Sequence, residues 1–154
     1  LPGPSGQVAR AMLSRPRSED PDSVVRHVLA LFRLIGSPAH PQDMPAFVDH
    51  LRATVERSYH PQGVSRQLLA VVADTDRHLL LRRIACPTLV LHGAADPLVP
   101  IVCGQDTAAR IPGSRFEAID GMGHDWPPGV AALLANHIVP HLRAAQSAST
   151  TGPS

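Results

Sequence analysis

The chain has 154 residues, 44% of them hydrophobic, which is enough for one domain with a buried core. Its formal net charge of +1 excludes a strong electrostatic attraction to nucleic acid or to an anionic membrane surface. Two cysteines exclude a disulfide framework, and Cys86 is expected to be an inert core thiol at the start of a buried strand. No signal peptide and no apolar run of roughly 18 residues is found, which predicts a cytoplasmic protein without a membrane partner.

The first predicted element is a long helix. Residues 1–20 are rich in Pro, Gly, Ser and Arg and predict a loop with one helical turn. Asp20 followed by Pro21 is a typical cap and first-turn pair. Apolar residues then recur at helical spacing until Gly36, which predicts a helix over about 21–35.

Three further helices are predicted before the first strand. Residues 37–42 contain two prolines and predict a loop, after which a second helix is expected over about 43–59. Pro61 opens a third helix, and residues 74–83 predict a short fourth one. The apolar face of the third helix is formed by Val64, Leu68, Leu69 and Val72.

Two short apolar runs predict strands, at Thr88–Leu91 and Arg115–Ile119. The helix-like stretch 104–111 lies between them, so the pattern predicts a right-handed βαβ unit with parallel strands. Parallel neighbours end at the same edge of a sheet, where open α/β sheets bind ligands. The loops after the two strands carry Asp96 and His124, and we expect these side chains to face each other.

A carboxylate beside an imidazole is suited to acid–base catalysis. The histidine takes a proton from a nucleophile and returns it to the leaving group. The carboxylate accepts a hydrogen bond from the other ring nitrogen and stabilises the imidazolium. Gly121 and Gly123 allow a close approach around His124, and Pro97 stiffens the loop of Asp96. Asp96 and His124 are therefore the candidate catalytic residues.

The C-terminal region predicts one more helix, over about 129–142. Pro128 suits its first turn, whereas Pro140 is expected to kink or end it. Residues 144–154 are small and polar and are expected to be disordered.

The remaining polar residues are assigned structural roles. His137 and His141 have the spacing of a helical metal site, but no third ligand follows at useful spacing and Pro140 lies between them. No metal and no cofactor is therefore expected. His92 is expected to be a packed structural histidine, with orientation of the acid loop as the alternative. Asp125 is expected to form hydrogen bonds or to start a helix.

Two loop motifs together resemble those of α/β-hydrolases. The first is P-T-L-V-L-H-G-A-A-D-P-L-V-P at 87–100, and the second combines I-P-G-S at 111–114 with G-M-G-H-D at 121–125. The chain looks most similar to bacterial esterases related to aclacinomycin methylesterase, over about residues 1–143. In that fold the triad follows the order Ser, Asp or Glu, His, so Asp96 and His124 match the acid and the base.

The resemblance implies an α/β class fold, namely the C-terminal part of an α/β-hydrolase, with a helical cap region and the last two parallel strands with their helices. Residues 1–83 then form the loop and cap region, 84–143 the core part, and 144–154 a disordered tail. A cap covers the pocket and shapes the choice of substrate. Candidates for substrate contact, with core or lid packing as the alternative, are Phe32, Phe47 and Trp126.

One departure from the family is large. No G-x-S-x-G elbow occurs, because Gly3-Pro4-Ser5-Gly6 has the wrong spacing and no preceding strand. The loop that supplies the oxyanion hole has no match either. The chain is therefore expected to be the back half of a longer enzyme, with the nucleophile in a missing N-terminal half as its partner, and to be inactive alone.

The implied activity is hydrolysis of a small-molecule carboxylic ester, including a methyl ester on an aromatic or polyketide-like molecule. Other chemistries of the fold stay open, namely C–C bond hydrolysis, haloperoxidase-like reactions and epoxide hydrolysis. A non-catalytic ligand-binding homologue is a second alternative, since fold does not determine function. A purely structural half-chain is a third, and two parallel strands without flanking neighbours disfavour it.

Overall fold

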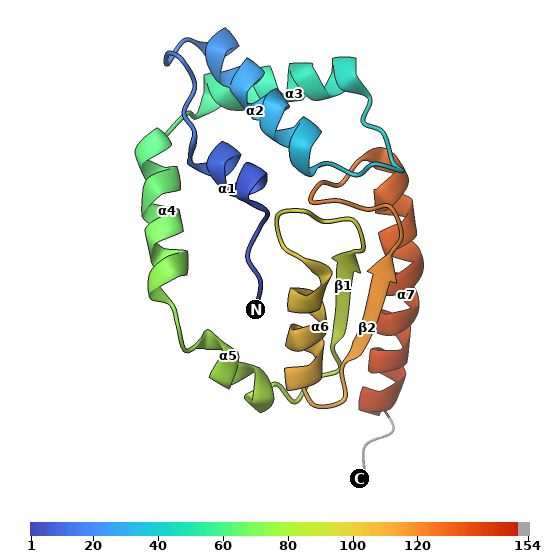
Figure 1. The fold of residues 1–154 in the computed structure, drawn as a ribbon. Coiled ribbons are helices and arrows are strands. Elements are labelled where there is room, and N and C mark those ends of the chain that lie inside the picture. Colours follow the sequence, from blue (N-terminus) through green and yellow to red (C-terminus); the bar gives the residue numbers. More distant parts are fainter. Residues whose placement is uncertain (151–154) are drawn as a thin grey trace.

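The computed structural model describes residues 1–150, and the side chains of residues 1–148. Seven α-helices, one 3-10 turn and two strands occur in this part of the chain (Figure 1). Within it, no helix combines the length and apolar character needed to cross a bilayer. The elements in chain order are α1 (Gly6–Leu13), α2 (Pro21–Ile35), α3 (Met44–Arg57), α4 (Pro61–Ala73), α5 (Arg77–Leu80), η1 (Leu81–Arg83), β1 (Leu89–Gly93), α6 (Ile101–Arg110), β2 (Arg115–Ile119) and α7 (Pro128–Thr150).

Helices α2 and α3 are set by their caps and held together by aromatic packing. The Asp20 carboxylate accepts a hydrogen bond from the Ser23 amide at 3.1 Å, which satisfies one free donor of the first turn of α2. Asp43 caps α3 in the same way. The rings of Phe32 and Phe47 meet edge to face, with centroids 4.9 Å apart. The predicted helix over 21–35 is confirmed, and the two helices form one layer (Figure 1).

Strands β1 and β2 pair in parallel, with α6 as the crossover, so the predicted βαβ unit is confirmed. The pairing runs from Leu89 beside Arg115 to Gly93 beside Ile119. The first strand thus extends two residues beyond its predicted end, because ladder pairing continues where the apolar run stops. The helix begins at Ile101, earlier than predicted, directly after Pro100 at its cap.

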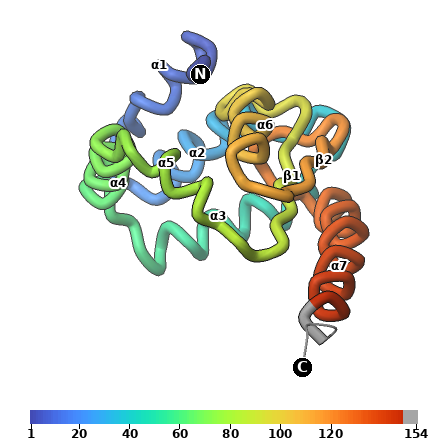
Figure 2. The backbone as a smooth tube through the Cα atoms, turned by 90° about the horizontal axis from the view of Figure 1, so that it is seen from below, coloured from blue at the N-terminus to red at the C-terminus, as the bar shows by residue number. Residues whose placement is uncertain are grey.

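The two faces of this sheet are covered by different helices. Neighbouring strand residues point to opposite faces. The ring of His92 packs against Gly104 of α6, where an added Cβ would collide with it. Leu91 packs instead on a buried cluster that includes Val130 and Leu134 of α7. Helices α6 and α7 therefore lie on opposite faces of the sheet (Figures 1 and 2).

Helix α4 forms where predicted, but its apolar face is not part of the core. No residue of α4 is buried. In Figure 1 it stands away from the sheet, and no described residue covers it. Its predicted apolar face is between 46% and 70% exposed at Val64, Leu68, Leu69 and Val72.

Helix α7 corrects two expectations about the C-terminus. The expected end of the helix at Pro140 is wrong, since α7 continues to Thr150, and the alternative of a kink at Pro140 stays a prediction. A proline costs one backbone hydrogen bond in a helix interior, but the alanine-rich stretch that follows has high helix propensity. Residues 144–150, for which disorder was expected, are therefore helical, and 151–154 lie outside the described residues.

The environment of Cys86 also differs from the expectation. Its thiol is exposed, not buried in a core. The reason is that β1 begins only at Leu89, so Cys86 lies in the connection that leads to the strand. Thr88 bonds back to the Cys86 carbonyl at 2.9 Å and turns this connection into the sheet.

Candidate active site

The loop after β1 holds the Asp96 carboxylate in a fixed position. One oxygen, Oδ1, accepts hydrogen bonds from the amides of Leu98 and Val99, each at 2.9 Å. Pro97 has no N–H to offer, so the two amides that follow it bind the side chain. The Asp96 side chain is only 6% exposed. Its second oxygen, Oδ2, is left to contact a group outside the loop.

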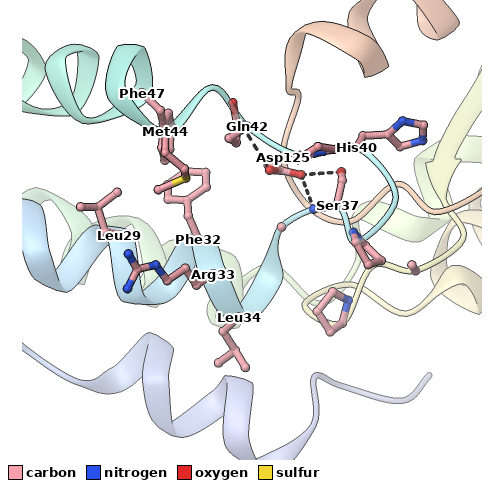
Figure 3. A pocket seen from close by; sticks show the side chains of 15 residues that line it. Leu29, Phe32, Arg33, Leu34, Ser37, His40, Gln42, Met44, Phe47 and Asp125 are labelled. Carbon is pink, nitrogen blue, oxygen red and sulfur yellow. Dashed lines mark hydrogen bonds between the residues drawn. The ribbon is translucent and has the colours of Figure 1, made fainter.

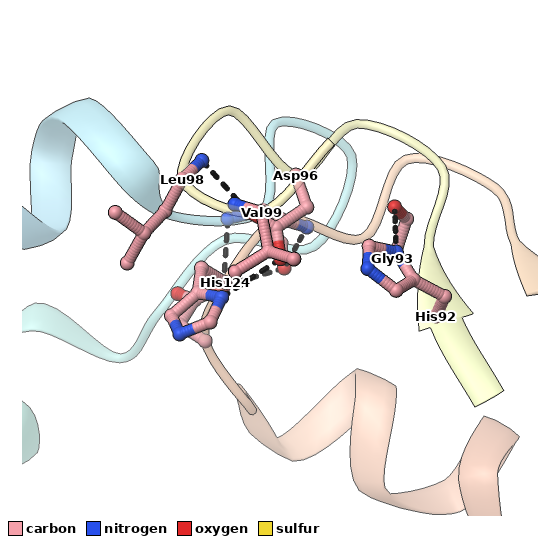
Figure 4. A network of polar contacts seen from close by, with 9 residues as sticks. His92, Gly93, Asp96, Leu98, Val99 and His124 are labelled. Carbon is pink, nitrogen blue, oxygen red and sulfur yellow. Dashed lines mark hydrogen bonds and ion pairs between the residues drawn. The ribbon is translucent and has the colours of Figure 1, made fainter. Parts of the chain in front are cut away.

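That group is the imidazole of His124, in the loop after β2. Its Nδ1 donates to Asp96 Oδ2 at 2.7 Å (Figure 4). An ionised carboxylate only accepts hydrogen bonds, so this contact places the proton on Nδ1 and leaves Nε2 as the free acceptor. The His124 side chain is 42% exposed, so Nε2 is open to a reacting group. The expected meeting of Asp96 and His124 is observed, and their catalytic role stays a prediction.

The two loops come together because their backbones touch. The Ala94 amide donates to the carbonyl of Ile119, the last residue of β2, at 3.0 Å, and the Ala95 amide donates to the carbonyl of Met122 in the second loop at 2.9 Å. A Cβ on Gly93 would lie 2.5 Å from the Met122 carbonyl oxygen, so only glycine allows this approach. The distance between the acid and the base is thus set by main-chain contacts.

A third segment, which sequence reasoning missed, completes the site. The stretch after α2, residues 35–42, lies along the His124 loop and binds it at several points. Ser37 and Gln42 of this stretch donate to Asp125. Asp125 therefore forms hydrogen bonds, as predicted, and it is 6% exposed. No local pattern predicts these contacts, because Ser37 and Gln42 lie 88 and 83 residues from Asp125 in the chain.

An open cavity of about 440 Å³ lies between α2, α3 and the loops that carry Asp96 and His124 (Figure 3). Phe32 and Phe47 line it, together with Leu29 and Met44, and Ser37, Gln42 and Asp125 give it a polar end. Two of the three candidates for substrate contact thus face one cavity. Trp126 does not line it and is 74% exposed.

His92, in the strand that leads to Asp96, forms no hydrogen bond with Asp96 or His124. His92 Nδ1 donates to the Gly93 carbonyl at 3.0 Å, and its ring packs on α6. Figure 4 shows it turned away from Asp96 and His124. This agrees with the predicted structural role. Within the described residues, no three His, Cys, Asp or Glu side chains cluster as metal ligands would.

Solved structures share this fold. An esterase, RhEst1, from Rhodococcus sp. ECU1013 matches 93% of this chain and 49% of its own, with a TM-score of 0.63 and 24% identity. An esterase from Exiguobacterium antarcticum gives a TM-score of 0.64 at 18% identity, over 89% of this chain and 47% of its own. The chain therefore has the fold of the C-terminal part of an α/β-hydrolase, as predicted.

In sequence the chain is similar to methyl ester hydrolases. It is 30% identical to rhodomycin D methylesterase DnrP of Streptomyces peucetius over 148 residues, 94% of this chain and 49% of that protein. A pimeloyl-[acyl-carrier protein] methyl ester esterase of Aromatoleum aromaticum is 36% identical over 56 residues, 36% of this chain and 22% of that protein. The chain thus spans about half the length of the methylesterase, and no protein-family model matches it. The suspected kinship with α/β-hydrolase esterases is confirmed.

Proposed function

We propose that this chain supplies the acid and the base of a Ser–His–Asp triad that hydrolyses a carboxylic ester, most specifically a methyl ester. The observation that carries the proposal is the 2.7 Å contact from His124 Nδ1 to Asp96 Oδ2, with Nε2 left free. The relatives support the ester class, since both named sequence relatives are methyl ester hydrolases.

The proposed reaction has two half-reactions. His124 Nε2 takes the proton of a serine hydroxyl as the serine attacks the ester carbonyl, and then returns the proton to the departing alcohol. Water repeats the sequence on the acyl-enzyme and releases the acid. Asp96 stabilises the imidazolium in both steps and stays ionised. No metal or cofactor is required by this chemistry.

The serine is proposed to lie in a segment outside this chain. His124 forms side-chain hydrogen bonds only with Asp96 among the described residues. Ser37, the serine of the neighbouring segment, is 8% exposed and is committed to Asp125 and to the Gly123 amide. The oxyanion donors are proposed to come from that same outside segment.

Residues 1–83 are proposed to act as the cap of this enzyme. Helices α2 and α3 carry one wall of the 440 Å³ cavity beside the catalytic loops. Phe32 and Phe47 supply apolar area there for the acid part of the ester. This assignment accounts for a largely helical region that contributes nothing to the sheet.

The test is ester hydrolysis by the complete enzyme, in which this chain is joined to the segment that carries the nucleophile. His124→Ala is expected to lower kcat on the order of 10³-fold or more, because the nucleophile then has no base. The matched control is His92→Ala, which removes an imidazole from the same sheet edge and is expected to lower the melting temperature with kcat retained. A His124→Ala enzyme with near-normal turnover would refute the triad.

A further inference from the structure

The main chain of the catalytic loop is held from one side by residues 35–37. The His124 amide donates to the Ile35 carbonyl at 2.7 Å. The Gly123 amide donates to Ser37 Oγ at 2.9 Å. Asp125 Oδ1 accepts from both the Ser37 amide, at 2.7 Å, and the Ser37 hydroxyl, at 2.5 Å. Three consecutive residues around the imidazole are therefore tied to the end of α2.

Asp125 is the central group of this arrangement. It is 6% exposed and has no part in the proposed triad, whose acid is Asp96. Its second oxygen accepts from Gln42 Nε2 at 3.3 Å, so both oxygens are used (Figure 3). A buried carboxylate is costly unless it is hydrogen-bonded, so this one is held in a single orientation.

The loop of His124 and residues 35–37 are packed closely against each other. A Cβ on Gly123 would lie 2.5 Å from the Ile35 carbonyl oxygen, and a Cβ on Gly36 would lie 3.1 Å from Asp125 Oδ2. On one side of the hydrogen bonds the two backbones touch directly, and on the other the Asp125 carboxylate lies close to the backbone of Gly36. A shift of residues 35–37 would be transmitted to the main chain of His124.

We propose that Asp125 is a positioning residue, which acts through Ser37 to hold the main chain of His124. Asp96 orients the ring, and Asp125 keeps the ring in the place where Nε2 reaches the nucleophile. Small displacements matter at this position, since an error of about 1 Å in a catalytic group costs about 10²-fold in rate. The proposal rests on the proposed function, because it requires His124 to be the base.

The experiment measures kcat and KM of the complete enzyme on a methyl ester. Asp125→Ala is expected to lower kcat about 10- to 100-fold, with KM changed less than about threefold. Asp125→Asn is expected to keep kcat within about fivefold, because its Oδ1 still accepts both bonds from Ser37 and Gln42 can turn its amide to accept from Nδ2. The matched control is Asp20→Ala, which removes the cap at the far end of α2 and should destabilise the protein with kcat unchanged.

A double substitution separates positioning from general stability. If Asp125 acts through His124, adding Asp125→Ala to His124→Ala causes no further loss of residual rate. A further loss of the same size as in the wild-type background would overturn the proposal. The proposal would also be overturned if folded Asp125→Ala kept kcat within threefold of wild type. It would be overturned as well if Asp20→Ala lowered kcat by as much as Asp125→Ala.

Two other outcomes are also decisive. If Asp125→Ala does not fold, Ser37→Ala decides, because it removes the hydroxyl link while the amide of residue 37 and Gln42 still donate to the Asp125 carboxylate. Unchanged kcat in that variant overturns the proposal. If His124→Ala itself turns over normally, the proposed function fails and the positioning role fails with it. The first result leaves the triad intact, so the two failures are distinguishable.

Discussion

At the residue scale, the tautomer of His124 depends on how Asp96 is held. Two backbone amides, of Leu98 and Val99, bind Oδ1 and leave only Oδ2 for the imidazole. The loop therefore controls which atom of the side chain faces His124. A substitution that exchanges only one carboxylate oxygen for an NH₂ group therefore tests the arrangement more directly than removal of the whole carboxylate.

Asp96→Asn is expected to lower kcat of the complete enzyme by about 10⁴-fold with the fold retained. The amides of Leu98 and Val99 keep the Asn oxygen, so the NH₂ group faces His124 Nδ1. His124 must then carry its proton on Nε2 and cannot act as a base. Steady-state kinetics and thermal unfolding check this together. Turnover within tenfold of wild type would show that the ring orientation does not depend on Asp96.

At the scale of elements, the proposed function assigns substrate choice and chemistry to different parts of the fold. The apolar wall of the 440 Å³ cavity comes from α2 and α3, whereas the loops that carry Asp96 and His124 extend from the sheet. The Phe32–Phe47 ring contact holds the two helices at this wall. Changes in the wall should therefore act on selectivity.

Phe47→Ala in the complete enzyme is expected to lower kcat/KM for esters of large ring-bearing acids by about 10- to 100-fold, because burial of an aromatic side chain contributes about 1.5–3 kcal/mol. Acetate esters should change less than about threefold, since they do not reach the wall. The matched control is Val48→Ala, one residue further along α3 and absent from the cavity lining. Equal losses on all esters would argue against a selective cap.

At the scale of the whole molecule, the described residues leave strand edges and one apolar helix face uncovered. β1 pairs only with β2 in this part of the chain, so its other edge has unpaired backbone groups. The apolar face of α4 is exposed as well. Exposed strand edges and large apolar patches promote association. Both kinds of surface are available for contact with a further segment.

The chain expressed alone is expected to aggregate and to show no ester hydrolysis that depends on His124. It has a base and an acid but, by the proposal, neither the nucleophile nor the oxyanion donors. Size-exclusion chromatography and p-nitrophenyl ester hydrolysis measure the two expectations. Co-expression with the segment that carries the nucleophile should restore both solubility and turnover. Robust turnover by the lone chain that disappears in His124→Ala would place the nucleophile within these residues.

The sequence determined the features that depend on a short stretch of chain. Caps at Asp20 and Asp43, apolar spacing and the two loop motifs were enough to predict most helices, the βαβ unit and the Asp96–His124 pair. These signals suffice because capping, periodicity and strand ends act within a few residues. The parallel crossover then brings two distant loops to one edge with no further information.

Contacts between distant segments and the burial of each face depend on how the elements pack, and the local sequence does not specify that packing. The bonds from Ser37 to Asp125 join residues 88 apart, and no local pattern encodes such a pairing. Exposure of α4 and of Cys86 depends on what packs beside them, which periodicity does not specify. Pro140 stays within α7 because the helix propensity of the residues after it outweighs the cost of the proline. The proline alone does not show which of these two contributions is larger.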